Sequence, residues 1–150
     1  MATATDATVD PLHLENQVCF GLVTAARSVV AFYRPFLEPL GLTHPQYLVM
    51  LALWEHGDLS VRAISDLLML EPATVSPLIK RLEAQGLLTR RRHAADERQL
   101  QVALTERGRA MRERALLIPP AIAAKLQMTP EEFAEMRAGL DKLVAAMSRA

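Results

Sequence analysis

Cysteine, aromatic residues and net charge are all scarce in this chain of 150 residues. Its single cysteine, Cys19, excludes an intramolecular disulfide and any zinc site built from several cysteines. The four histidines have no metal-ligand spacing, so we expect no metal and no cofactor. No apolar run approaches the ~20 residues that span a bilayer, and the N-terminal MATATDATVD lacks the features of a secretory signal. These absences predict a cytoplasmic protein.

The formal net charge is zero, so any affinity for a polyanion has to come from local clustering. Such a cluster lies between Thr74 and Arg98, where basic side chains outnumber acidic ones. The basic residues are Lys80, Arg81, Arg90, Arg91, Arg92 and Arg98, and the acidic ones are Glu83, Asp96 and Glu97. The segment carries a net charge of about +3 and the rest of the chain about −3, which indicates a nucleic acid as partner.

Apolar residues make up 51% of the chain and aromatic residues only 5%, a composition typical of packed helices. A chain of this length buries roughly 70% of its unfolded surface, and we expect one domain. Apolar residues three and four positions apart predict helices over about 11–40, 43–57, 60–68, 73–86, 105–118 and from 129 onward. Helix-start signals accompany several of them: Thr43 with Gln46, Ser60, and Thr129 with Glu132. Pro119 and Pro120 are expected to disturb the helix that begins near Thr105.

Between these helices, two short segments have the composition of strands. They are 87–92 (LLTRRR) and 100–105 (LQVALT), joined by the polar HAADERQ, and they predict a hairpin. Two short helices followed by a basic hairpin indicate a winged helix-turn-helix. The fold class is therefore mainly α with a small β wing. A winged helix-turn-helix at about 43–105 lies between helices at about 11–40 and 106–148, whose apolar stripes are expected to form a homodimer.

The helix over 73–86 has the properties of a recognition helix. Short polar side chains near its N-terminus allow that end to enter the major groove of double-stranded DNA. Thr74, Ser76 and Pro77 are the candidates there, and Lys80, one turn further on, can reach guanine or the backbone. The alternative is an amphipathic core helix with an ordinary Ser/Thr cap; the basic hairpin that follows favours DNA contact.

The predicted wing supplies the remaining DNA candidates. Of Arg90, Arg91 and Arg92, at most two can point toward phosphates, because side chains alternate along a strand. Arg98 at the tip is a candidate for the minor groove. Asp96 is expected to pair with an arginine and hold the tip in shape. The alternative for this segment is a solvated charged turn.

Two stretches of the sequence resemble a known family. The run LEPATVSPLIKRLEAQGLLTRRRHAADERQLQVALTERG resembles the recognition helix and wing of the MarR family. LENQVCF, followed by YRPFLEPLGLTHPQYLVMLALWE, resembles its organic-hydroperoxide-sensing branch, the OhrR regulators of one-cysteine type. The resemblance implies a dimeric repressor on an inverted-repeat operator. It also implies that an organic hydroperoxide oxidises Cys19, that a low-molecular-weight thiol can then join it, and that the operator is released.

In the resembling branch, two tyrosine hydroxyls stabilise the reactive thiolate. One matches Tyr33; the other falls at position 44, where this chain has His44, and Tyr47 is a weaker candidate. Tyr33 lies 14 residues from Cys19 on the same predicted helix, a rise of roughly 21 Å, so the two can meet only across a dimer. Cys19 is expected about two turns into this helix, beyond the strongest part of its dipole. A protonated His44 would favour the thiolate more than a phenol does.

Several alternatives stay open. Cys19 on an apolar stripe suits an ordinary core residue, and irreversible over-oxidation competes with thiol addition. A related repressor released by a small phenolic or other hydrophobic ligand would need no cysteine oxidation. A thiol peroxidase would leave the basic wing without a purpose, so we expect no enzyme. An architectural DNA protein conflicts with the zero net charge, because such binding rests on many phosphate contacts.

Overall fold

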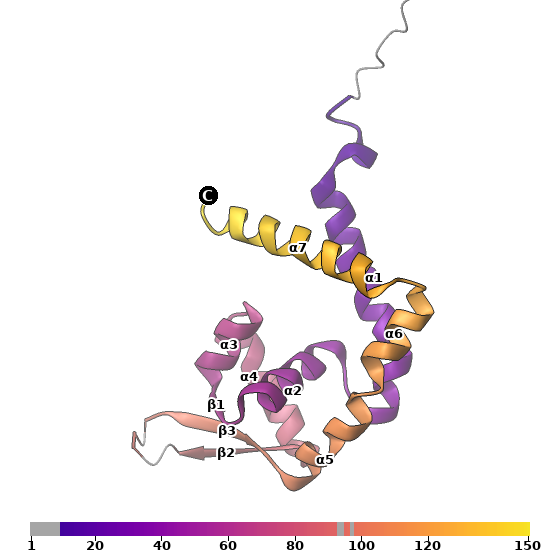
Figure 1. The fold of residues 1–150 in the computed structure, drawn as a ribbon. Helices are drawn as coiled ribbons and strands as arrows, with labels where there is room; N and C mark the ends of the chain where they lie inside the picture. The colour runs from indigo at the N-terminus through magenta and orange to yellow at the C-terminus, as the bar shows by residue number, and fades with distance from the viewer. Residues whose placement is uncertain (1–9, 93–94, 97) are drawn as a thin grey trace, which may run out of the picture. The chain divides into compact units, whose positions relative to one another are not determined.

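The computed structural model describes residues 10–92, 95–96 and 98–150 (Figure 1). The chain divides into two compact units, Met1–Leu48 and Val49–Ala150. The first holds the short helix η1 (Leu14–Asn16), α1 (Val18–Leu37), η2 (Glu38–Leu40) and the start of α2 (His44–His56). The second holds the rest of α2, then β1 (Leu59–Ser60), α3 (Val61–Leu68), α4 (Pro72–Ala84), β2 (Leu88–Arg92), β3 (Leu100–Leu104), α5 (Glu106–Ala115), α6 (Ile118–Leu126) and α7 (Pro130–Met147). The predicted fold class, mainly helical with a small antiparallel sheet, is confirmed.

The first helix begins later than predicted. Instead of starting near Pro11, α1 starts at Val18, after the 3-10 turn η1 and an extended Gln17 (φ −86°, ψ 107°). Polar side chains explain the delay: the Asp10 carboxylate accepts from the Leu12 amide at 2.9 Å, and the Gln17 side chain donates to the Pro11 carbonyl. Such local bonds compete with helix formation. Cys19 is consequently the second residue of α1, and its predicted place two turns inside the helix is wrong.

The end of α1 and the start of α2 follow the sequence signals. Gly41 takes the left-handed conformation (φ 68°) that ends η2. The Thr43 amide then donates to Gln46 Oε1 at 2.9 Å, and the Gln46 amide donates to Thr43 Oγ1 at 3.4 Å. This reciprocal pair is the predicted capping box, and α2 begins at His44 as expected.

In the second unit, α3 and α4 form the helix-turn-helix. Ser60 caps α3 by accepting a hydrogen bond from the Ala63 amide at 3.0 Å, as predicted. The turn passes through Met69, which has a positive φ of 54°, and α4 opens with Pro72 at its first position. The buried side chains of α4 are Val75, Ile79 and Leu82. Their spacing leaves the opposite face of α4 open to a ligand.

The wing is the hairpin β2–β3, in the register Leu88↔Leu104 to Arg92↔Leu100 (Figure 1). A two-residue strand, β1, was not predicted; it pairs with β3 so that the strand order is β1-β3-β2. The sheet therefore joins the start of α3 to the wing, since β1 leads directly into that helix. Residues 93, 94 and 97 of the predicted tip lie outside the described residues.

The C-terminal helices differ from the prediction at one point. Pro119 and Pro120 do not simply disturb the preceding helix: α5 ends at Ala115, and the prolines occupy the first turn of a separate helix, α6. A proline fits there because the amides of a first turn have no partner within the helix. α7 starts as predicted, with a complete capping box between Thr129 and Glu132. None of the helices in the described residues is long and apolar enough to cross a membrane.

Candidate functional site

The exposed face of α4 carries all four predicted recognition residues. Thr74, Ser76, Pro77 and Lys80 are exposed, on the side opposite the buried residues of the same helix. The Ser76 hydroxyl donates to the Pro72 carbonyl at 2.9 Å, so its oxygen remains available as an acceptor. Thr74 lies in the first turn of α4, the part of a recognition helix that contacts base edges. These four side chains are small or polar, and one of them, Lys80, carries a positive charge.

Arg90 is bound to α4. Its Nη2 lies 2.8 Å from Glu83 Oε2, its Nε donates to the same oxygen at 2.9 Å, and its backbone amide donates to Glu83 Oε1 at 3.2 Å. These hydrogen bonds lower the pKa of the Glu83 carboxyl. Arg90 therefore fastens the base of the wing to the end of α4, and Arg91 and Arg92 are the exposed arginines that follow it on β2.

At the wing tip, Asp96 holds the backbone next to Arg98. Its Oδ1 accepts a hydrogen bond from the Arg98 amide at 3.0 Å, and its carbonyl accepts one from the Gln99 amide at 3.1 Å. The sequence interpretation gave Asp96 an arginine side chain as partner; the bond that the structure describes goes to the arginine's backbone instead. Asp96 thus shapes the turn from which the Arg98 side chain extends.

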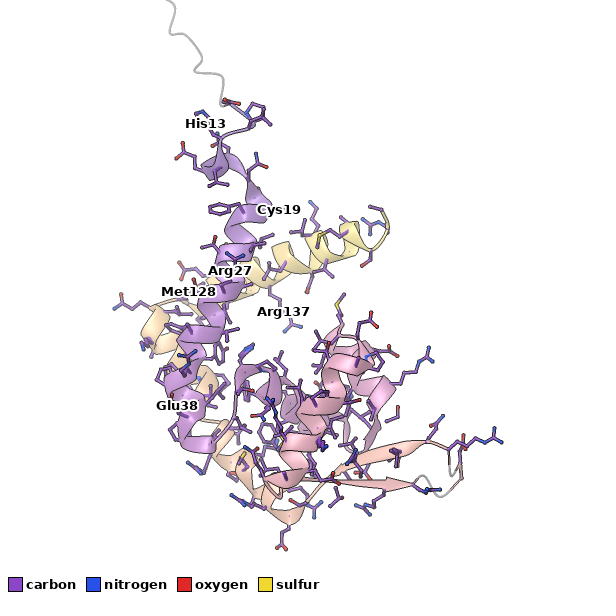
Figure 2. The ribbon with its side chains drawn as sticks, turned by 180° about the vertical axis from the view of Figure 1, so that it is seen from behind. His13, Cys19, Arg27, Glu38, Met128 and Arg137 are labelled. Carbon is purple, nitrogen blue, oxygen red and sulfur yellow. The ribbon has the colours of Figure 1, made fainter. Side chains whose placement is uncertain are left out.

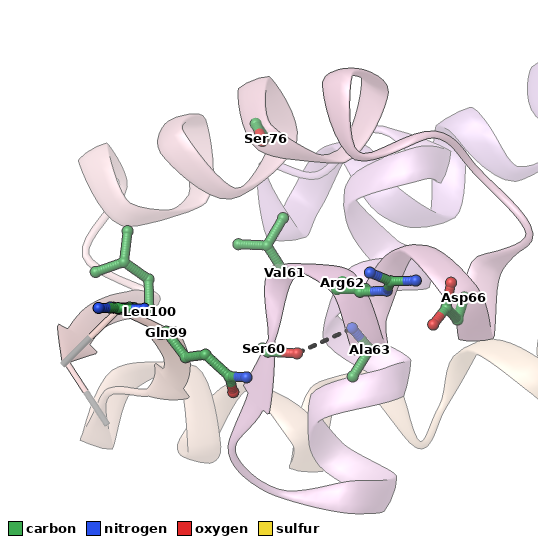
Figure 3. A pocket seen from close by; sticks show the side chains of 9 residues that line it. Ser60, Val61, Arg62, Ala63, Asp66, Ser76, Gln99 and Leu100 are labelled. Atoms are coloured by element: carbon green, nitrogen blue, oxygen red, sulfur yellow. Dashed lines mark hydrogen bonds between the residues drawn. The ribbon is translucent and has the colours of Figure 1, made fainter. Parts of the chain in front are cut away.

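A groove lies between the helix-turn-helix and the wing (Figure 3). It has a volume of about 550 Å³. Its lining residues come from the end of β1, from α3, from the exposed face of α4, and from the first residue of β3 with the two residues before it: Ser60, Val61, Arg62, Ala63, Asp66, Ser76, Arg98, Gln99 and Leu100. The sequence analysis did not single out Arg62 or the groove. The signal available was a cation two residues after the Ser60 cap, at the start of the first helix of the helix-turn-helix.

Three of the four predicted sensing residues lie together in the first unit. The Tyr33 and His44 rings meet edge to face with centroids 4.9 Å apart, and the Tyr47 ring lies 6.1 Å from Tyr33 and 6.4 Å from His44. Burial lowers the pKa of His44. Burial, and secondarily the Tyr33 phenol, raise the pKa of Tyr47. Both shifts favour the uncharged forms of the His44 imidazole and the Tyr47 phenol, which can donate hydrogen bonds without carrying charge.

The fourth residue, Cys19, lies near the other end of α1 and is exposed (Figure 2). Tyr33 lies 14 positions further along the same continuous helix, a rise of roughly 21 Å. One chain therefore does not bring the thiol and the Tyr33 cluster together. Cys19 lies in the first turn of α1. Backbone N–H groups there have no partner inside the helix and favour a negative charge nearby.

No group of three or more His, Cys, Asp or Glu side chains suited to a metal ion occurs among the residues described.

Comparison with known proteins identifies the family. The MarR family profile matches residues 42–100. The organic hydroperoxide resistance transcriptional regulator of Bacillus subtilis is 38% identical over 138 residues, which are 92% of this chain and 94% of that protein. The chain belongs to the MarR family. Like its relatives in this family, it is a DNA-binding transcriptional regulator and not an enzyme.

Solved structures of MarR-type regulators agree with this assignment. The overoxidised form of AbfR bound to DNA has a TM-score of 0.72 and 33% identity, covering 89% of this chain and 94% of AbfR. BpsR of Bordetella bronchiseptica, whose DNA binding is regulated by 6-hydroxynicotinic acid, has a TM-score of 0.76 and 30% identity, covering 93% of this chain and 99% of BpsR. The resemblance to the MarR family and its hydroperoxide-sensing branch, noted from the sequence motifs, is confirmed.

Proposed function

We propose that this MarR-family regulator is a homodimeric, cytoplasmic repressor that releases an inverted-repeat operator when an organic hydroperoxide oxidises Cys19. The observation that carries the proposal is the 38% identity to the hydroperoxide resistance regulator over nearly the whole of both chains. The placement of the predicted residues supports it, because a recognition face, a basic wing, a ring cluster and an exposed thiol are all present.

DNA contact is divided between α4 and the wing. Thr74, Ser76, Pro77 and Lys80 enter the major groove, since they share the exposed face of α4. Arg91, Arg92 and Arg98 contact the flanking DNA through the wing. Arg90 serves instead to hold the wing against Glu83.

The terminal helices form the dimer. α7 has no buried residue, and large apolar side chains are exposed on it: Met136, Leu140, Val144 and Met147. α1 likewise exposes Val18, Phe20, Val23, Val29 and Val30. Contiguous apolar faces of this kind mark protein–protein contacts. A second copy of the chain that covers each of these faces forms a self-complementary contact.

The sensing site then assembles from two subunits. Cys19 of one protomer meets Tyr33, His44 and Tyr47 of its partner, because the length of α1 separates the thiol from its own cluster. The thiolate attacks the peroxide, the O–O bond breaks, and with one proton the products are a cysteine sulfenic acid and an alcohol. A low-molecular-weight thiol then condenses with the sulfenic acid, forming a mixed disulfide and water. Burying a bulky or charged adduct in this interface costs free energy. A shift of the helices that relieves this cost also changes the distance between the two winged helix-turn-helix regions of the dimer.

His44 contributes through hydrogen bonding. Its lowered pKa keeps the imidazole neutral at physiological pH, so it donates to the thiolate in the manner of a phenol and adds no positive charge. Over-oxidation is the competing fate of the sulfenic acid. AbfR has been solved on DNA in its overoxidised form, which supports the view that the bulk of an adduct, more than oxidation itself, drives release.

The second candidate is a repressor released by a small phenolic or other hydrophobic ligand. One observation favours it: a cavity of about 260 Å³ lies beside His44, lined by Val30, Arg34, Glu38, Leu42, Thr43, His44 and Pro45. An aromatic acid would find there an apolar wall and the Arg34 guanidinium, with the Glu38 carboxylate as an opposing charge. BpsR, which a hydroxylated aromatic acid regulates, is a structural neighbour.

A mixed-dimer experiment tests the cross-subunit site. One subunit carries Cys19→Ser and keeps Tyr33, and the other carries Tyr33→Phe and keeps Cys19. If the site is shared between subunits, this dimer retains one intact pair and responds to cumene hydroperoxide, measured as loss of fluorescence anisotropy of a labelled duplex from the intergenic region beside the gene. The two homodimeric variants are the controls. A mixed dimer as unresponsive as Cys19→Ser alone contradicts the cross-subunit arrangement.

A further inference from the structure

The turn between α4 and β2, residues 85–87, is tied to the start of α5. Its consecutive backbone carbonyls each accept a hydrogen bond from α5 or from the cap residue of that helix. Arg107 Nη1 donates to the Gln85 carbonyl at 3.1 Å, and the Thr105 hydroxyl donates to the Gly86 carbonyl at 2.7 Å. The Thr105 amide donates to the Leu87 carbonyl at 3.0 Å. The end of α4 is therefore fastened to another helix.

Arg107 completes the cap at the C-terminal end of α4. In the backbone, the Leu87 amide donates to the Leu82 carbonyl at 3.0 Å, across a Gly86 that has the left-handed conformation (φ 75°). This is the Schellman arrangement, which satisfies carbonyls of the last helical turn. Gln85 is the C-cap residue, and its carbonyl accepts from the Arg107 guanidinium. A cation at this point also suits the negative end of the helix dipole.

The first turn of α5 is itself held by contacts with other elements. Thr105 caps it by accepting a hydrogen bond from the Gly108 amide at 3.0 Å. Trp54 Nε1, on α2, donates to the Gly108 carbonyl at 3.0 Å. Arg109 Nη1 donates to the Leu104 carbonyl, at the end of β3, at 2.8 Å. This turn is therefore a fixed support for the end of α4.

The angle at which α4 is held matters for the opposite end of the helix. Thr74 lies 11 residues before Gln85, or about 16 Å along the helix axis. A tilt of about 5° at the held end displaces Thr74 by about 1.4 Å. Ordinary hydrogen-bond lengths vary over only about 0.5 Å. Contacts with base edges are therefore sensitive to this tilt, whereas long, flexible basic side chains still reach phosphates.

We propose that Arg107 is a positioning residue, which holds the end of α4 on α5 and so sets the angle at which α4 reads DNA. The inference rests on the proposed entry of α4 into the major groove. Figure 1 shows α5 beside the end of the hairpin where β2 begins and β3 ends. The wing residues proposed to contact DNA follow at the other end. Arg107 thus acts through α4 and not through a DNA contact of its own.

Hydrogen exchange followed by mass spectrometry tests the fastening without DNA. Arg107→Gln should speed exchange in a peptide that covers residues 82–87 by about fivefold, the factor to which one hydrogen bond corresponds. Arg107→Lys keeps the charge and can donate to the carbonyl, so it should stay within about twofold of wild type. Arg112→Gln is the matched control, since it removes an exposed arginine from the same helix. Equal exchange in Arg107→Gln and Arg112→Gln overturns the inference.

Anisotropy titrations test the effect on DNA reading, with two labelled duplexes of equal length, the intergenic DNA beside the gene and a random sequence. Arg107→Gln should raise the Kd for the intergenic duplex about fivefold and change that for the random duplex by less than about twofold. The slope of log K against log[salt] should stay unchanged, because the number of phosphate contacts stays the same. Arg107→Lys should restore the ratio of the two Kd values, and Arg112→Gln should leave it as in wild type. Thermal unfolding shows whether each variant is folded at the assay temperature.

The outcomes separate the inference from the function on which it rests. If Arg107→Gln weakens both duplexes and makes the slope shallower by about 1.8 for the two arginines of a dimer, Arg107 contacts phosphates and the inference is wrong. If the folded variant keeps the wild-type ratio of Kd values, Arg107 serves stability alone and the inference is again wrong. If wild type shows no preference for the intergenic duplex, operator recognition as proposed fails, and hydrogen exchange decides whether Arg107 holds α4.

Discussion

Gly108 offers the sharpest test of the packing that positions the wing. A Cβ at this position would lie 2.2 Å from the Leu87 carbonyl oxygen and 3.2 Å from Leu104 Cδ2. The first distance is 1.2 Å short of the 3.4 Å at which ordinary contact begins, and the obstacle is backbone. Gly108 also accepts a hydrogen bond from Trp54 Nε1 at 3.0 Å. Gly108→Ala therefore has to displace α5 from the strand that leads into the wing.

The expected cost follows from these contacts. Overpacking of this kind costs about 1–3 kcal/mol, and weakening the Trp54 bond about 1 kcal/mol more, while alanine gains about 1 kcal/mol of helix propensity. The net loss is about 2 kcal/mol in the free energy of unfolding, or a fall in Tm of about 4–8 °C for a chain of this size.

Urea and thermal unfolding, followed by circular dichroism, measure this loss. Gly139→Ala is the matched control, since Gly139 lies in α7 and a Cβ added there would have nothing within 4 Å. That variant should be neutral or more stable by up to about 1 kcal/mol. If Gly108→Ala is as stable as Gly139→Ala, α5 does not approach Leu87 this closely in solution and the argument fails.

Three further predictions concern the wing, the ring cluster and the dimer. Glu83→Gln should raise the Kd for DNA several-fold in anisotropy titrations and leave the slope of log K against log[salt] unchanged. The reason is that Glu83 positions Arg90 and neutralises no phosphate. A loss of affinity that occurs only at low salt would contradict this. Lowering the pH from about 7.5 to about 5.5 should reduce the Tm of wild type more than that of His44→Phe, because the lowered pKa of His44 means that the unfolded chain takes up the proton first; equal losses would show that His44 is not the group responsible. Leu140→Glu on the exposed face of α7 should shift the dimer toward monomer in light scattering, and an unchanged mass would remove that face from the interface.

The sequence predicted helix starts closely where a capping residue marks them. The reciprocal caps at Thr43 and Thr129 and the Ser60 cap are local hydrogen-bond patterns, written within four residues, and the structure contains all three. The hairpin was likewise readable, because two short segments with the composition of strands flank a polar tip. The apolar spacing of α4 also predicted which of its side chains are exposed.

The wrong or missing predictions have two causes. Local side-chain hydrogen bonds compete with helix formation, and residues far apart in the sequence meet only in the folded chain. The delayed start of α1 depends on side chains such as Asp10 and Gln17 bonding to nearby backbone, which periodicity does not register. The role of Arg90 depends on Glu83, seven residues away on another element. The groove around Arg62 depends on three elements meeting, and only the folded chain brings them together.

The central claim is that Cys19 gates DNA binding. The direct measurement is a titration of the labelled intergenic duplex with reduced protein, before and after cumene hydroperoxide and a small thiol, for wild type and for Cys19→Ser. Our account predicts that the peroxide releases wild type from DNA and leaves Cys19→Ser bound with its original Kd. If both proteins stay bound, or if both are released, oxidation of Cys19 is not the switch, and a ligand at the cavity beside His44 becomes the better explanation.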